Sequence, residues 1–226
     1  MIRTATKLTL ALLLSSIAFA QTSPYPRMAP LAEYQMTRDA EIAMARSAAP
    51  ASISADAEIL VLGAKNYEVA APGKNGFVCM VLRSFAAAID APEFWNPKIR
   101  GPICLNAEGA RSWLPHVRMK AEWALAGLST EQMAERIKAA LAAKEYPPFE
   151  PGAMSYMMSK DGYLSDNGGH WHPHLMFFVA ATDAAAWGAN LPGSPVLASP
   201  DTPEHYTIFL LTVSDWSDGS SAETMK

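Results

Sequence analysis

Three parts of the chain have hydrophobic residues spaced three or four positions apart, with charged residues between them. These parts are residues 31–48, residues 117–128 and the segment between residue 129 and Pro147. The spacing places the apolar side chains on one face, so each part is predicted to form an amphipathic helix. A capping box, Ser129-Thr130-Glu131-Gln132, opens the third helix. Asn106 is a predicted cap for a further helix from residue 107, which Pro115 is expected to interrupt or restart.

Short apolar runs between turn-forming residues predict strands elsewhere in the chain. The predicted strands are residues 58–62, 66–70, 77–84, 153–159, 175–181 and 206–213. Asn75-Gly76 is typical of a tight turn between two neighbouring strands, and a meander is the simplest arrangement of the first three. Residues 160–173 and the proline-rich residues 190–203 are expected to be long loops, and loops of this length often carry function.

The order of these elements predicts the fold class. Strands lie on both sides of a helical middle, without the alternation of strand and helix that is typical of a parallel sheet. We therefore expect an α+β fold, with a mainly antiparallel sheet and helices packed on one face. The 226 residues are 50% hydrophobic and 18% charged, which is typical of a globular chain and does not require division into several domains.

The first twenty residues have the pattern of a signal peptide. Arg3 and Lys7 precede an apolar run over residues 8–19, and Ala18-Phe19-Ala20 forms a small-x-small cleavage site. An N-terminal membrane anchor is the alternative, but about a dozen apolar residues fall short of the ~20 that a spanning helix needs. We expect cleavage after residue 20, leaving a single globular domain of residues 21–226 in the periplasm or outside the cell. No stable membrane insertion is expected.

The charge of the chain argues against nucleic acid as a partner. The formal net charge is −4, and removal of Arg3 and Lys7 with the signal peptide makes it about −6. Acidic surfaces repel phosphate backbones, and no run of basic residues offsets this mean charge. Anionic membrane surfaces are disfavoured for the same reason.

Cys79 and Cys104 are the two cysteines of the chain. In an oxidising compartment, one pair without an odd thiol predicts a disulfide. Two buried free thiols are the alternative, because Cys79 lies in an apolar run. A redox role is not indicated, since the spacing is not C-x-x-C.

Three of the five histidines fall within five residues, as His170, His172 and His174. In extended backbone these alternate side chains share one face, and Trp171 points to the other. Imidazoles at positions i and i+2 start ~6.8 Å apart and can converge on one ion, whereas those at i and i+4 start ~13.6 Å apart. We therefore expect two of the three to bind a divalent metal or a small molecule, with a further ligand from elsewhere.

Candidates for this further metal ligand are side chains with a carboxylate or an imidazole group. The candidates are Asp161, Asp166, His116, Glu108 and His205. Zinc is favoured over copper, because Met154 and Met158 face one side of the predicted strand and Met157 faces the other. The histidine run resembles the H-x-H half of a cupin-type metal site over five residues, whereas the downstream Glu and the glycine spacing of that family are missing.

These observations leave several functions open. A histidine pair with a carboxylate would suit a metal-dependent hydrolase that activates a bound water. A metal-free site would use one histidine as acid or base. The alternative is a non-catalytic secreted binding or structural protein in which the histidines are structural and Trp171 and residues 190–203 form a contact surface.

Overall fold

The computed structural model describes residues 24–169 and 171–222. The predicted signal peptide and His170 lie outside this part of the chain. The helices are α1 (Leu31–Tyr34), α2 (Arg38–Arg46), α3 (Ala51–Ser54), α4 (Ala107–Ser112), α5 (Leu114–Leu125) and α6 (Thr130–Ala143), with 3-10 turns η1 (Ser84–Ala86) and η2 (Ala185–Trp187). The strands are β1 (Glu58–Leu62), β2 (Tyr67–Ala71), β3 (Val78–Leu82), β4 (Gly101–Leu105), β5 (Met154–Met157), β6 (His174–Ala180), β7 (Val196–Asp201) and β8 (Tyr206–Thr212). In the two described ranges, no helix is long and apolar enough to cross a membrane.

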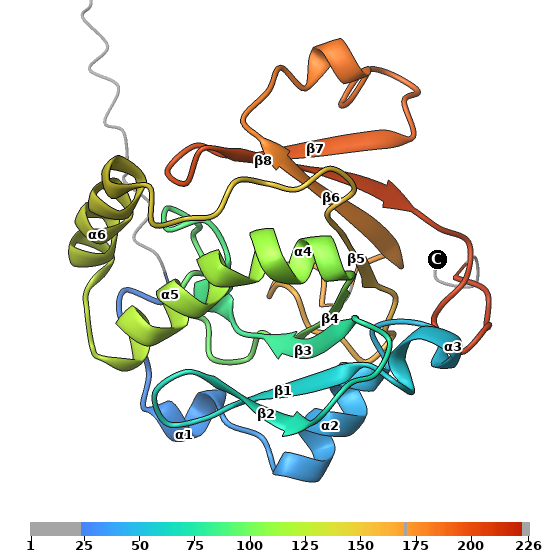
Figure 1. Ribbon diagram of the computed structural model, residues 1–226, viewed down its shortest axis with the longest axis horizontal. Coiled ribbons are helices and arrows are strands. Elements are labelled where there is room, and N and C mark those ends of the chain that lie inside the picture. The colour runs from blue at the N-terminus through green and yellow to red at the C-terminus, as the bar shows by residue number, and fades with distance from the viewer. Residues whose placement is uncertain (1–23, 170, 223–226) are drawn as a thin grey trace, which may run out of the picture.

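The eight strands form one sheet in the order β2-β1-β3-β4-β5-β6-β8-β7 (Figure 1). All neighbouring strands are antiparallel except β1 and β3, which pair in parallel. The predicted α+β class with a mainly antiparallel sheet is confirmed. The predicted meander over the first three strands is wrong, because β3 pairs with β1 and not with β2. Between β2 and β3 the chain passes the beginning of β1, where the N–H of Lys74 donates to the carbonyl of Asp56 at 2.8 Å.

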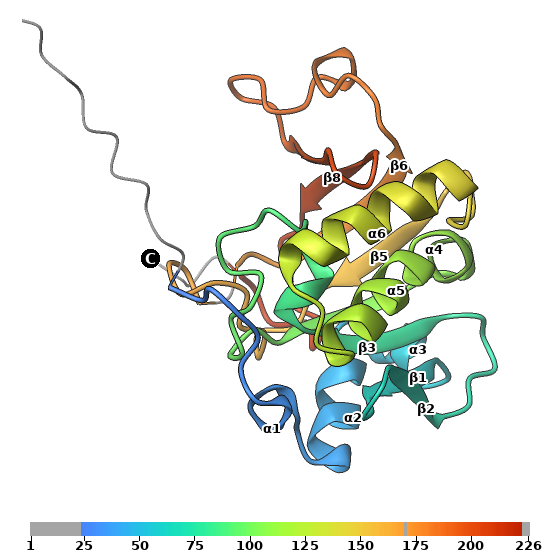
Figure 2. The ribbon, with the colours of Figure 1, turned by 90° about the vertical axis from the view of Figure 1, so that its left-hand side faces the viewer.

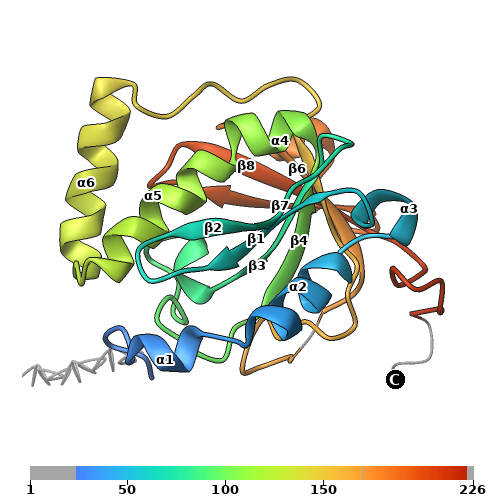
Figure 3. The ribbon, with the colours of Figure 1, turned by 60° about the horizontal axis from the view of Figure 1, so that its bottom comes forward.

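Alternating side chains of the strands build two hydrophobic clusters on opposite faces of the sheet. Leu60, Met80 and Ile103 belong to the larger cluster, beneath α5 and α6. Ile59 and Val81 belong to the smaller cluster, beneath α2 and α3. Figure 2 shows α5 and α6 side by side, and Figure 3 shows α2 on the other side of the strands from α4 and α5. Helices therefore cover both faces around β1, β3 and β4, where one face was expected, because these strands are apolar on both sides.

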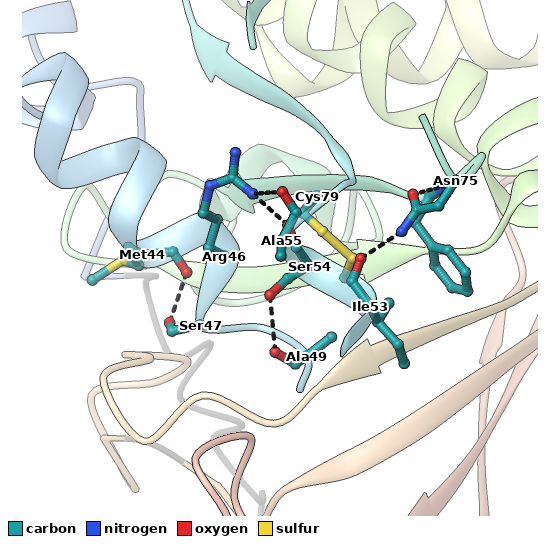
Figure 4. Close-up of a disulfide and its surroundings, with 11 residues drawn as sticks. Met44, Arg46, Ser47, Ala49, Ile53, Ser54, Ala55, Asn75 and Cys79 are labelled. Atoms are coloured by element: carbon teal, nitrogen blue, oxygen red, sulfur yellow. Dashed lines mark hydrogen bonds between the residues drawn. A yellow bond between two sulfur atoms is a disulfide. The ribbon is translucent and has the colours of Figure 1, made fainter. Parts of the chain in front are cut away.

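A disulfide between Cys79 and Cys104 confirms the predicted pair. The two residues lie directly opposite each other on β3 and β4, so the bond joins adjacent strands. Figure 4 shows the disulfide beside α3, where Asn75 donates to the carbonyl of Ile53 at 2.7 Å. The bond belongs to the smaller hydrophobic cluster, and it fixes the middle of the sheet on that face.

Local capping explains where the helices begin and end. Asn106 accepts the N–H of Gly109 at the start of α4, and both bonds of the capping box are formed at α6, as predicted. The helix expected over residues 31–48 is divided into α1 and α2. The carbonyl oxygen of Tyr34 accepts a hydrogen bond from Nε of Arg83 at 2.6 Å. This side-chain bond satisfies the carbonyl at the point where the helix is interrupted.

The proline-rich residues 190–203, expected to be a loop, contain the edge strand β7. This strand pairs with β8 along its whole length, and Pro200 fits there because an edge strand has one unpaired side. The loop before β7, which carries η2, projects beyond the sheet in Figure 1. In that loop, the exposed Trp187 stacks on Phe209 of β8 at 4.7 Å between ring centroids.

Candidate functional site

A cavity of about 280 Å³ lies on the sheet face that carries α4 and α5. The sheet contributes Leu82, Gly101, Met157, Met176, Asp201 and Ile208, drawn from six different strands. The opposite wall comes from η1 and the residues after it, together with Trp113 at the junction of α4 and α5. Most of this lining is apolar. The polar residues of the lining are Asp201, Tyr206, Ser84, Ser199 and Arg83.

Two larger hollows lie elsewhere on the molecule. One, of about 530 Å³, lies between the segment after residue 25 and the start of α6. The other, of about 500 Å³, has a lining of Leu164, Ser165, Asn167, Gly168, Gly169, Trp171, His174 and Leu210. Among the described residues, neither hollow has a buried carboxylate on its wall. The 280 Å³ cavity is therefore the stronger candidate site, because buried ionisable groups beside an apolar pocket are typical of ligand sites.

Asp201 is the acidic group on the cavity wall. It ends β7 directly opposite Tyr206, the first residue of β8, and only 4% of its surface is exposed. Its Oδ1 accepts the backbone N–H of Glu204 at 3.0 Å, and its carboxyl group hydrogen-bonds with the hydroxyl of Tyr206. Burial raises the pKa of Asp201, although the nearby Lys120 acts in the opposite direction.

Behind the cavity wall, Lys120 and Glu204 form a fully buried ion pair. Lys120 also donates to the carbonyls of Ala86 and Ala87, at 3.0 and 2.9 Å, so it holds the residues around η1 in place. The other oxygen of Glu204 lies 2.8 Å from Nδ1 of His116. Burial acts to raise the pKa of Glu204, but Lys120 and His116 outweigh burial and lower it. Glu204 is therefore held as a carboxylate.

The remaining buried cation near the cavity, Arg83, is paired with Glu41. Its Nη2 lies 2.8 Å from Oε1 of Glu41, and neither side chain is more than 2% exposed. Nε and Nη1 donate to the carbonyls of Tyr34 and Val81. The same Glu41 oxygen accepts the N–H of Leu62 at 3.0 Å. Arg83 and Glu41 thus neutralise each other, and their role is to fix α2 against the sheet.

Ser84 supplies a hydroxyl group on the cavity wall. The side chain is buried, and apart from a weak interaction with the hydroxyl of Tyr34 its Oγ makes no hydrogen bond to another described residue. Buried polar atoms usually have a partner, and leaving one without costs about 1–3 kcal/mol. A ligand atom in the cavity would supply that partner.

The two predicted histidines that the structure describes, His172 and His174, do not line this cavity. His174 begins β6 and is buried, with Nδ1 2.7 Å from the carbonyl oxygen of His172 and its ring 4.8 Å from that of Trp171. Burial lowers the pKa of His174, which favours a neutral ring. His172 is exposed. The two side chains are therefore in different surroundings, one packed under Trp171 and the other in solvent.

The candidates for a further metal ligand are dispersed among other interactions. Asp166 accepts from Tyr163 at 2.6 Å, Lys98 at 2.9 Å and Asn96 at 3.1 Å, and it also contacts the hydroxyl of Tyr25. These hydrogen bonds, led by that of Tyr163, hold the pKa of Asp166 far below its usual range. The carboxylate thus ties the described residues 160–169 to the loop before β4.

The other candidate metal ligands also lie in separate surroundings. Glu108 binds Arg111 on α4, at 3.2 Å, while Asp161 and His205 are exposed and His205 has a φ of +59°. His116 belongs to the buried pair with Glu204 described above. Within residues 24–169 and 171–222 no group of three His, Cys, Asp or Glu side chains could hold a metal ion. Because His170 lies outside these ranges, the three-histidine metal site stays a prediction.

Sequence reasoning missed Asp201, Glu204 and Lys120. One signal was available for Lys120, because it and His116 fall in the apolar stripe of α5 formed by Val117, Ala121 and Ala124. A charged residue in such a stripe indicates a buried partner. Nothing in the local sequence indicated that the partner was Glu204.

Comparisons of the chain with models of protein families, with curated protein sequences and with solved structures give no match. The functional proposals for the cavity are therefore based on its geometry and on the chemistry of its walls.

Proposed function

We propose that this chain is a binding protein for a small organic molecule, which occupies the cavity beside Asp201. The observation that carries the proposal is an apolar cavity lined by the buried carboxyl group of Asp201 and by the buried hydroxyl group of Ser84, which makes only a weak interaction with Tyr34. Ligand sites are mostly apolar, with a few polar groups that fix orientation. At about 280 Å³ the cavity is slightly smaller than the usual range of about 300–1,000 Å³, which favours a ligand smaller than a typical drug.

The cavity has an accessible side. Ala87 and Ala88, after η1, line it, and Ala87 is exposed while Ala88 is partly exposed. Ser199 and Pro200 of the edge strand β7 also line the cavity and are exposed, whereas Met176 is buried. A ligand would therefore enter between Ala87 and these β7 residues and place its apolar part against Met176. Each square ångström of apolar surface removed from water would contribute about 25 cal/mol.

Methionine methyl groups offer a local test of binding. Met157 and Met176 line the cavity, whereas Met133 is buried in the core on α6. With 13C-labelled methionine methyl groups, a neutral aromatic probe such as 2-phenylethanol is expected to shift the signals of Met157 and Met176 and to leave that of Met133 unchanged. The titration gives the dissociation constant.

A blocked variant supplies the control. Ala87→Trp places a large side chain at the entrance and is expected to abolish the shifts. Ala139→Trp makes the same exchange at an exposed position of α6 and should bind like the wild type. The proposal fails if small neutral, cationic and anionic aromatic probes all leave Met157 and Met176 unshifted, or if the two tryptophan variants bind them equally.

A further inference from the structure

The carboxyl group of Asp201 differs from the other buried ionisable groups around the cavity, because no cation among the described residues is paired with it. Arg83 is paired with Glu41, and Lys120 is paired with Glu204. Asp201 forms no ion pair with a described residue, and its contacts are the N–H of Glu204 and the hydroxyl of Tyr206. Lys120 and Arg83 are each held by another carboxylate, so no described cation lies within ion-pair distance of Asp201. A buried carboxylate without a cation is costly, so the cavity wall has a place for one positive charge.

The walls next to Asp201 suit an ammonium group attached to an apolar body. Ser84 lines the same cavity and offers a hydroxyl oxygen without a strong partner, which can accept a hydrogen bond from a ligand ammonium group. Trp113 offers an aromatic ring on the cavity wall, and aromatic rings attract cations. Met176 and Ile208 provide apolar surface beyond them. A ligand carboxylate would instead meet the carboxyl group of Asp201 and be repelled.

We propose that the ligand of the cavity is a small primary amine with an apolar body, whose ammonium group pairs with the Asp201 carboxylate and donates to Ser84. This inference rests on the proposed small-molecule function and adds the chemical class of the ligand. Burial raises the pKa of Asp201 in the empty protein, and a bound ammonium group would lower that pKa again. The amine and the ionised carboxylate therefore stabilise each other.

Three probes of similar size separate the possibilities: 2-phenylethylamine, 2-phenylethanol and phenylacetate. Their dissociation constants are measured from the Met157 and Met176 methyl shifts. The amine is expected to bind about tenfold or more tightly than the alcohol, since hydrogen bonds to charged groups are about twice as strong as neutral ones. Phenylacetate is expected to bind most weakly.

Substitution of the carboxyl group tests its role directly. Asp201→Asn keeps an oxygen that can accept the N–H of Glu204 but removes the charge, so the amine should lose about tenfold in affinity and the alcohol little. Asp56→Asn makes the same exchange at an exposed position and should leave both affinities unchanged. If Asp201→Asn does not fold, Ser84→Ala in a folded protein is the second variant, and it should also weaken the amine more than the alcohol.

The outcomes distinguish this inference from the proposed function. Equal binding of amine and alcohol, or tighter binding of phenylacetate, with shifts at Met157 and Met176 would overturn the amine assignment and leave the small-molecule function standing. Equal losses for amine and alcohol in both Asp201→Asn and Ser84→Ala would also overturn it. No shift with any of the three probes would overturn both.

Discussion

The carboxylate of Glu204 contacts the ammonium group of Lys120 in the protein interior, where neither side chain is exposed. Glu204 lies in the turn between β7 and β8, and Lys120 lies on α5, so the contact joins the edge of the sheet to the helical layer. Asp201, at the start of the same turn, lines the cavity, and Lys120 holds the carbonyls of Ala86 and Ala87 on its other wall. This single ion pair therefore sets the distance between two walls of the candidate site.

Removal of one member of this pair should strongly destabilise the protein. Glu204→Gln keeps the shape of the side chain but leaves Lys120 buried without a counter-ion, and we expect a loss of about 3–5 kcal/mol in the free energy of unfolding. Urea denaturation measures this loss. Glu135→Gln, which breaks the exposed pair with Lys138, should cost less than about 1 kcal/mol.

A second variant separates loss of charge from loss of shape. Glu204→Gln combined with Lys120→Met removes both charges, and it should recover part of the stability lost in Glu204→Gln alone. Equal effects of Glu204→Gln and Glu135→Gln would contradict the assignment of a buried, structure-determining pair.

The stability of the ligand-free protein should depend on the ionisation of Asp201. Burial raises the pKa of this carboxyl group in the folded protein, so the folded state favours the protonated form. The resulting stabilisation is complete at pH values below about 3.9, the pKa of Asp in the unfolded chain. It is lost as the pH rises through the pKa that Asp201 has in the folded protein. Relative to Asp201→Asn, which stays neutral, the wild type should therefore become more stable as the pH falls from about 7 to about 4. Thermal unfolding of both proteins over this range is the measurement, and a constant difference would contradict the prediction.

Loss of the disulfide should lower stability without changing the fold. Cys79 and Cys104 are 25 residues apart, and closing a loop of this length stabilises the folded state by about 3–4 kcal/mol. Replacing both by Ala should reduce the free energy of unfolding by about this amount. A reductant should destabilise the wild type similarly and leave the double variant unaffected. If the reductant has no effect on the oxidised wild type, the bond is not contributing to stability.

Asp166 should control the order of residues 160–169. Its carboxylate accepts hydrogen bonds from Tyr163, Lys98 and Asn96, which join this loop to the segment before β4. Asp166→Ala is expected to speed hydrogen exchange of the backbone amides in the loop while the amides of β4 and β6 keep their rates. Asp161→Ala, at an exposed position of the same loop, should change little. Similar exchange in the two variants would show that Asp166 does not hold the loop.

Features encoded by neighbouring residues could be predicted from the sequence. The capping box that opens α6 and the Asn106 cap of α4 each use bonds between residues three positions apart, so the chain contains all the information about them. The disulfide was predictable for a different reason: with two cysteines in the chain, one intramolecular pairing is possible. By contrast, the periodicity of residues 31–48 did not reveal the break after Tyr34, because Arg83, 49 residues later, binds the carbonyl there.

The candidate site was not predictable in the same way. The histidine run is conspicuous in the sequence, but its described members separate into a buried ring and an exposed one. The polar groups of the cavity come instead from distant positions, Ser84, Asp201 and Tyr206, none of which forms a recognisable motif. His116 and Glu204 are 88 residues apart, and only the fold brings them into contact.

The sequence by itself determined the α+β class, the positions of most helices and strands, and the disulfide pair, because local hydrogen bonding and hydrophobic periodicity act over a few residues. The tertiary structure alone decided that β3 lies parallel to β1, that proline-rich residues form the edge strand β7, and that helices cover both sheet faces. It also decided where the cavity and its buried charges lie. These features depend on which distant segments supply hydrogen-bond partners and exclude water, and those free energies arise only when the chain has folded.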